Sequence, residues 1–101
     1  MSRADGILHL VLNAHPWDEI AADRKPVEYR GLHWANKVLS RGYHTVRLQR
    51  AFQRGADGKV PTMLRRIREI DRGPADPRWT YGVVPAGEMF VRIWLGEQVQ
   101  P

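Results

Sequence analysis

A small mixed α+β domain with a barrel-like β core is the fold class that the sequence predicts. The chain has 101 residues, 43% of them hydrophobic and 27% charged, which is the size and composition of one ordinary globular domain. About five segments have the pattern of strands, whereas two have apolar residues at helical spacing. We therefore expect a single domain over residues 1–101, with about five strands and two short helices around one core.

In the first half of the chain, predicted strands and helices alternate. Ile7–Leu12 is almost wholly apolar, as in a buried strand, and Lys25–Arg30 has the pattern of a second strand that a glycine ends. A short helix is expected to begin at Pro16, because proline suits a first helical position and two acidic residues follow it. His33–Leu39 carries an apolar stripe at helical spacing, so it is predicted to form the second helix.

The second half is predicted to be rich in β structure. Tyr43–Phe52 and Glu88–Leu95 both alternate apolar and polar residues, as strands with one buried face do. A hairpin-like turn is expected at Arg54–Lys59, which contains an Asp-Gly pair. Gly73–Gly87 holds three prolines and two aromatic residues, so we expect an irregular loop that its aromatic side chains tether.

The segment Thr62–Asp71 is ambiguous. Met63, Leu64, Ile67 and Ile70 recur at helical spacing, and this periodicity favours a helix. Its position after a hairpin-like turn in a β-rich chain favours a strand instead.

Positive charge is concentrated in one part of the chain. Between Arg47 and Arg78 there are nine basic and four acidic residues, so this stretch accounts for the whole net charge of +5. Most of these basic residues are arginines, whose planar guanidinium suits phosphates and nucleobase edges. RNA or another polyanion is therefore a candidate partner, and a solvated charged face is the alternative.

Several classes of site are excluded by composition and spacing. The absence of cysteine excludes disulfides, thiolate catalysis and cysteine-ligated zinc, and it fits a cytoplasmic protein. No apolar run reaches the roughly 18 residues of a membrane span, and the first residues lack the layout of a signal peptide, so no membrane partner is expected. The oligomeric state stays open.

Familiar catalytic signatures are also missing. Ser2 and Ser40 are the only serines, and neither lies in a nucleophile-elbow pattern. The four histidines do not fall at metal-ligand spacing, and no glycine-rich phosphate loop is present. We therefore expect neither a metal nor a cofactor.

A dense polar cluster lies between Asp23 and Trp34. In the predicted strand, Glu28 and Arg30 are two residues apart and share a face, while Lys25 opens the strand. A lysine, a carboxylate, an arginine and a tryptophan within ten residues can hold a planar ligand that forms hydrogen bonds. The alternative is a surface ion-pair network that contributes only ~0–1 kcal/mol.

Five segments of the chain, taken in order, resemble the ASCH (activating-signal-cointegrator-homology) domain family of the PUA-like superfamily. The resemblance runs from Ile7 to Glu97 through LHLVLNAHPWDEIAADRKPVEYR, LHWANKVL, YHTVRLQRAF, IREIDRGPADPRW and FVRIWLGE. It implies a small PUA-like β-barrel of five to six strands with two short helices and a cleft beside the first helix. It also implies that Thr62–Asp71 is a strand.

One branch of this family is similar to bacterial N(4)-acetylcytidine amidohydrolases, which remove the acyl group from the exocyclic amine of cytidine. The resemblance implies that Lys25 matches the catalytic lysine of that branch. Glu28 stands where that branch has a participating threonine, and it matches the wider family pattern instead. The remote catalytic glutamate of those enzymes has no aligned counterpart, and Glu69 and Glu88 are the two candidates for it.

The resemblance and the polar cluster together define a candidate site. Lys25 and Glu28 are the catalytic candidates: one activates a water molecule and the other stabilises the oxyanion. A nearby carboxylate favours the charged ammonium, whereas desolvation favours the neutral amine, so both assignments stay open. The substrate-binding candidates are Asn13, Arg30, Trp34, Trp79 and Tyr81.

Three functions follow from these expectations. The first is an amidohydrolase acting on N(4)-acetylcytidine-like nucleosides without a metal. The second is an RNA-binding ASCH module, and the third is a metal-independent ribonuclease. Trp34 and Trp79 would stack on a base or line the cleft in the first case, with core packing as the alternative for each.

Overall fold

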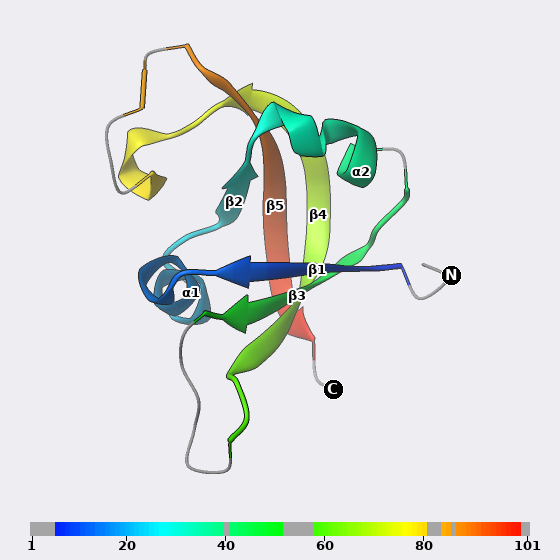
Figure 1. The fold of residues 1–101 in the computed structure, drawn as a ribbon, viewed down its shortest axis with the longest axis vertical. Helices are drawn as coiled ribbons and strands as arrows, with labels where there is room; N and C mark the ends of the chain where they lie inside the picture. The colour runs from blue at the N-terminus through cyan, green and yellow to red at the C-terminus, as the bar shows by residue number, and fades with distance from the viewer. Residues whose placement is uncertain (1–5, 40, 52–57, 81–83, 86, 100–101) are drawn as a thin grey trace.

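The structure is a five-stranded sheet that curls into a half-barrel, with two short helices at its sides (Figure 1). It is a computed structural model, and it describes residues 6–39, 41–51, 58–80, 84–85 and 87–99. The strands are β1 (Ile7–Leu12), β2 (Val27–Arg30), β3 (Thr45–Arg50), β4 (Thr62–Pro74) and β5 (Met89–Val99). The helices are α1 (Ala14–Ala21) and α2 (Ala35–Leu39), with 3-10 turns η1 (Leu32–Trp34) and η2 (Pro77–Trp79). The predicted small α+β fold with a barrel-like sheet is confirmed.

The strand order is β1-β3-β4-β5-β2, so β1 and β2 are the two edges of the sheet. β1 pairs in parallel with β3, and the other neighbouring pairs are antiparallel. α1 follows β1 and leads to β2, so this helix bridges the two edges. The indole Nε1 of Trp17 anchors α1 by donating a hydrogen bond of 3.1 Å to the carbonyl oxygen of Leu48 in β3.

The core lies on the concave face of the sheet. Alternate residues of β1 and β5 point into it, as the period of two residues in a strand requires. α1 adds the buried Ile20, and α2 adds the buried Ala35 and Val38. The buried hydrophobic residues of this cluster are Leu8, Leu10, Leu12, Ile20, Ala35, Val38, Tyr43, Val46, Leu48, Met63, Val91, Ile93 and Leu95.

β4 shows why periodicity misjudged Thr62–Asp71. Ile67 and Ile70 pair with Leu95 and Ile93 of β5, so three steps along β4 correspond to two steps along β5. This irregularity is a β-bulge, and it returns Ile70 to the inner face at a spacing that imitates a helix. The helical interpretation of this segment is therefore wrong, and the strand implied by the family resemblance is correct.

The boundaries of the helices differ from the predicted ones in two places. α1 begins at Ala14, two residues before the predicted start, and Pro16 lies within its first turn, where a missing N–H costs nothing. The predicted helix His33–Leu39 is divided into η1 and α2. Among the described residues, neither helix has the length or the apolar character needed to cross a bilayer.

The strands also differ in extent from the predicted ones. β2 begins at Val27 and not at Lys25, β3 is shorter than Tyr43–Phe52, and β5 continues beyond Leu95 to Val99. β4 runs to Pro74 and so takes in the start of the predicted loop Gly73–Gly87. Phe52 and most of the predicted turn Arg54–Lys59 lie outside the described residues.

Candidate functional site

Three charged side chains form a chain of ion pairs at the start and along the inner face of β2. Glu28 and Arg30 pair with the buried Ile93 and Val91 of β5, so they share a face of the sheet, as predicted, and that face is the core side. The Nζ of Lys25 lies 2.9 Å from Oε1 of Glu28, and Nη2 of Arg30 lies 3.3 Å from Oε2 of the same carboxylate. The side chains of Lys25 and Glu28 are only 4% and 10% exposed. The alternative of a surface ion-pair network therefore does not apply to them.

The turn between α1 and β2 holds Lys25 in place. Asp23 has a φ of 61°, in the left-handed region that aspartate tolerates better than most residues, and this lets the chain turn sharply. The backbone N–H of Lys25 then donates to the carbonyl oxygen of Glu19 at 3.2 Å. From this position the side chain of Lys25 reaches Glu28 in β2.

Arg65 of β4 fastens the same turn to the sheet. Its guanidinium donates hydrogen bonds to the carbonyl oxygens of Gly96 at 2.8 Å and Ile20 at 3.2 Å, and to Oδ1 of Asp23 at 2.8 Å. The side chain is 8% exposed, because Arg65 shares the inner face of β4 with Met63. A single buried arginine therefore links the end of α1, the turn and β5.

Two neighbouring pockets lie beside the ion pairs. The first, which we call the aromatic pocket, has a volume of about 190 Å³ and is lined by Pro16, Lys25, Glu28, Tyr29, Ala75, Trp79, Thr80, Val84 and Phe90. The second, which we call the Arg30 pocket, has a volume of about 350 Å³ and is lined by Val11, Leu12, Asn13, Pro16, Glu28, Tyr29, Arg30, Gly31 and Trp34. Pro16, Glu28 and Tyr29 belong to both, so the two pockets form one cleft beside α1.

The cleft contains every predicted site residue that the structure describes. Lys25, Glu28 and Trp79 line the aromatic pocket, whereas Asn13, Arg30 and Trp34 line the other pocket together with Glu28. Tyr81 lies outside the described residues.

The two candidates for a remote glutamate lie elsewhere. Glu69 lines a separate pocket with Arg68 and Trp94, and Glu88 is an exposed residue that lines neither part of the cleft.

Sequence reasoning missed six residues of the aromatic pocket: Pro16, Tyr29, Ala75, Thr80, Val84 and Phe90. Strand alternation puts Tyr29 on the face opposite Glu28, and so away from the predicted site. β2 is an edge strand, however, and residues from both of its faces line the pocket. The rings of Tyr29 and Phe90 are in contact there, with centroids 5.8 Å apart.

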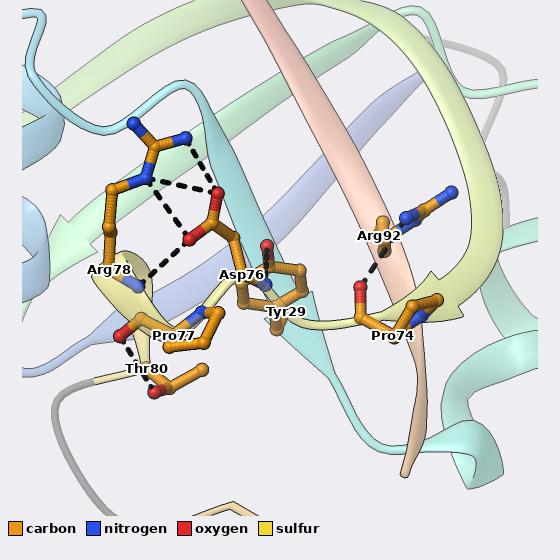
Figure 2. Close-up of polar contacts among 7 residues, drawn as sticks. All are labelled: Tyr29, Pro74, Asp76, Pro77, Arg78, Thr80 and Arg92. Carbon is orange, nitrogen blue, oxygen red and sulfur yellow. Dashed lines mark hydrogen bonds and ion pairs between the residues drawn. The ribbon is translucent and has the colours of Figure 1, made fainter. Parts of the chain in front are cut away.

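The segment after β4 carries Trp79 into the cleft, and it is held mainly by polar contacts (Figure 2). The hydroxyl of Tyr29 accepts a hydrogen bond of 2.9 Å from the backbone N–H of Asp76. The carboxylate of Asp76 in turn accepts from the backbone N–H and the guanidinium of Arg78. On the other side, Nη1 of Arg92 donates to the carbonyl oxygen of Pro74 at 3.4 Å. Side chains of β2 and β5 thus tether this segment, while Tyr81, one of the two aromatic residues predicted to tether the loop, lies outside the described residues.

Replacing Tyr29 with phenylalanine tests this tether. The substitution leaves the N–H of Asp76 without its acceptor, so we expect the free energy of unfolding to fall by about 1 kcal/mol in urea titrations. Tyr43→Phe is the matched control, because the hydroxyl of Tyr43 makes no hydrogen bond within the described part of the chain. Equal losses in the two variants would contradict a specific role for Tyr29.

Arg92 is itself held by Asp71 on the outer face of β4 and β5. Its Nε and Nη2 donate to the two carboxylate oxygens at 2.7 and 2.8 Å, and these hydrogen bonds lower the pKa of Asp71 below its ordinary value. Trp94 adds a further hydrogen bond of 3.2 Å to the same carboxylate. The anchor of Pro74 therefore depends on ionised Asp71.

The lowered pKa of Asp71 predicts an acid dependence of stability. A carboxyl whose pKa is lower in the folded state stabilises the fold above its unfolded pKa of about 3.9, and this contribution is lost as the pH falls through the folded pKa. We expect Asp71→Asn to lose less stability than the wild type between pH 6 and about pH 3 in urea titrations. Glu97→Gln, an exposed control, should keep the wild-type dependence. An unchanged dependence in Asp71→Asn would contradict the assignment.

Trp34 is part of the wall of the Arg30 pocket and also packs against the core cluster. Cζ of Arg30 and Nζ of Lys37 lie 5.3 and 4.6 Å from the centroid of its ring. Cations at these distances are attracted to the face of an indole. These contacts favour a role for Trp34 in orienting Arg30 over a role as an open stacking platform.

The excess of positive charge between Arg47 and Arg78 is partly balanced in three dimensions. Arg50, Arg65 and Arg66 form ion pairs with Asp18, Asp23 and Glu97, which all lie outside that stretch. Arg78 pairs with Asp76 inside it. A charge count along the chain thus overstates the positive potential of this surface.

No three His, Asp or Glu side chains within the described ranges converge so as to hold a metal ion. Comparison of the chain with known protein families, with curated proteins and with solved structures finds no match. Its function must therefore be inferred from the chemistry of the cleft.

Proposed function

We propose that this chain is a PUA-like, ASCH-type domain that hydrolyses the amide of N(4)-acetylcytidine-like substrates. The observation that carries the proposal is the buried ion pair of Lys25 and Glu28 in a pocket walled by aromatic side chains. Ring side chains such as those of Trp79 and Phe90 suit a flat heterocycle. An ammonium beside a carboxylate supplies the two charges that amide hydrolysis requires.

We assign the two catalytic roles from the geometry of the pair. In the ion-paired state Lys25 is a cation, which suits it to stabilise the oxyanion that forms on the acyl oxygen. Glu28 is an anion and suits the role of general base. Its Oε2 is the less tightly held oxygen, since the contact with Arg30 is 3.3 Å and that of Oε1 with Lys25 is 2.9 Å.

The reaction then balances with these two residues alone. A water molecule attacks the acyl carbon while Glu28 takes its proton, and the ammonium of Lys25 faces the tetrahedral oxyanion. The bond between the acyl carbon and N4 breaks as Glu28 returns the proton to the leaving amine. The products are the free cytosine amine and a carboxylic acid.

A direct assay separates this proposal from the two alternatives. The protein is incubated in EDTA with N(4)-acetylcytidine and, separately, with a labelled single-stranded RNA. We expect chromatography to show the release of cytidine and acetate from N(4)-acetylcytidine. The RNA should stay intact. Cleavage of the RNA would favour a ribonuclease instead, and the absence of product from both substrates would favour an RNA-binding module.

A further inference from the structure

The Arg30 pocket adjoins the site of the proposed chemistry but contributes only Glu28 to it. Among the described residues that line it, the other charged side chain is that of Arg30, whose Nη2 donates to the carbonyl oxygen of Val11 at 3.0 Å and contacts Glu28 at 3.3 Å. Within the described part of the chain, Nε of Arg30 is buried and has no hydrogen-bond acceptor. Buried donors without acceptors are rare in folded proteins, so this guanidinium has capacity for a further partner.

Asn13 offers a second polar group to the same pocket. It occupies the N-cap position of α1, but its side chain makes no capping hydrogen bond to the first turn. The residue is exposed and lines the pocket together with Arg30 of β2. The carboxamide can therefore donate a hydrogen bond to a bound ligand.

The charges around the cleft do not cancel. The carboxylate of Glu28 is shared by two cations, Lys25 and Arg30, so this group of three carries one net positive charge. Lys37 adds another cation beside Trp34 on the wall of the Arg30 pocket. Such an arrangement attracts an anion, and a guanidinium with free donors suits the oxygens of a phosphate.

The sizes of the two pockets also bear on the substrate. The aromatic pocket, at about 190 Å³, is smaller than the roughly 300–1,000 Å³ of ordinary small-molecule sites. A ligand whose base occupies it must therefore extend into the neighbouring pocket of about 350 Å³. The part of the ligand that is attached to the base then lies beside Arg30.

We infer that the Arg30 pocket binds a phosphate attached to the ribose, so the substrate is an acylated cytidine nucleotide rather than a free nucleoside. The inference deepens the proposed function and rests on it, since it names the substrate class of the same cleft. A mononucleotide and a residue within RNA share this chemistry. Arg30 acts in this assignment as a substrate-binding residue, with Asn13 as a second donor.

The test compares kcat/KM for N(4)-acetylcytidine, its 5′- and 3′-monophosphates, and a trinucleotide with a central N(4)-acetylcytidine. We expect the phosphate-bearing substrates to be preferred at least tenfold, and Arg30→Gln to remove most of that preference. Arg72→Gln, an exposed arginine of β4, is the matched control and should keep it. A higher value for the trinucleotide than for the monophosphates would identify RNA as the source of the phosphate, and the reverse order would identify a mononucleotide.

A binding measurement keeps the inference independent of turnover. Calorimetric titration with cytidine and with its monophosphates should give tighter binding of the monophosphates, and Arg30→Gln should abolish the difference. If no acylated substrate is hydrolysed but this difference is found, the proposed function fails while the phosphate pocket stands. Equal values for nucleoside and nucleotides in both measurements would overturn the inference. If circular dichroism shows that Arg30→Gln is unfolded, Asn13→Ala at an exposed position takes its place. We expect this substitution to reduce the preference for phosphate-bearing substrates about threefold.

Discussion

Replacing Lys25 with methionine is expected to lower kcat on N(4)-acetylcytidine, or on its phosphorylated forms, by about 100-fold or more. Methionine keeps much of the buried volume of the lysine stem, but it removes the only charge that faces the developing oxyanion in the proposed mechanism. Glu28 keeps its contact with Arg30, so the destabilisation should be smaller than the roughly 3–5 kcal/mol typical of breaking a buried ion pair. Steady-state kinetics and urea titration on the same preparation separate these two effects.

Lys59→Met is the matched control for this experiment. Lys59 is an exposed lysine at the start of the segment that leads into β4, remote in the chain from β2, and its replacement should leave kcat unchanged. Glu28→Gln should lower kcat as much as Lys25→Met, because the two residues act on the same step. A value of kcat within threefold of the wild type in Lys25→Met would contradict the assigned role, provided that the wild type hydrolyses the substrate.

Replacing Arg65 with methionine is expected to cost about 2–5 kcal/mol of unfolding free energy. The side chain is buried, and its loss removes a hydrogen-bond donor from the carbonyl oxygens of Ile20 and Gly96, of which Ile20 keeps the backbone N–H of Asp23 as a donor. For a domain of this size, such a loss corresponds to a fall in the melting temperature of about 10 °C or more. Thermal and urea unfolding followed by circular dichroism measure both quantities.

The neighbouring Arg66 is a close control, because it lies on the opposite face of β4. Its side chain is 55% exposed and pairs with Glu97, which is 72% exposed, so Arg66→Met should change the unfolding free energy by only ~0–1 kcal/mol. Equal and small effects of the two substitutions would show that Arg65 does not act as a clamp. A large effect confined to Arg65 would support the view that β4 fixes the turn carrying Lys25.

Local patterns in the sequence were sufficient to predict the main helices and strands and the face of β2 that carries Glu28 and Arg30. The apolar segment Ile7–Leu12 forms β1 with the predicted bounds, and Glu28 and Arg30 share one face of β2 as their two-residue spacing predicts. These features depend on the period of side chains along a strand, which neighbouring residues set by themselves. The same reasoning failed at Ile67 and Ile70, where a bulge against β5 changes the spacing of inward-facing residues.

The burial of the charges could not be predicted from local patterns. Whether Lys25 and Glu28 lie in water or in the interior depends on the turn that Arg65 fastens and on the segment that Tyr29 and Arg92 hold. Each of these contacts joins residues more than 15 positions apart in the chain. The acidic partners of the arginines between Arg47 and Arg78 are mostly just as distant, so a count along the chain could not reveal them.

The sequence by itself thus determined a curled α+β sheet and the residue types on β2, because periodicity and turn chemistry act between neighbours. Only the tertiary structure decided that an ion pair is buried, that Tyr29 borders the cleft and that Nε of Arg30 has no acceptor among the described residues. These properties depend on which distant side chains exclude water or supply an acceptor. These distant side chains come together only when the chain folds around its core.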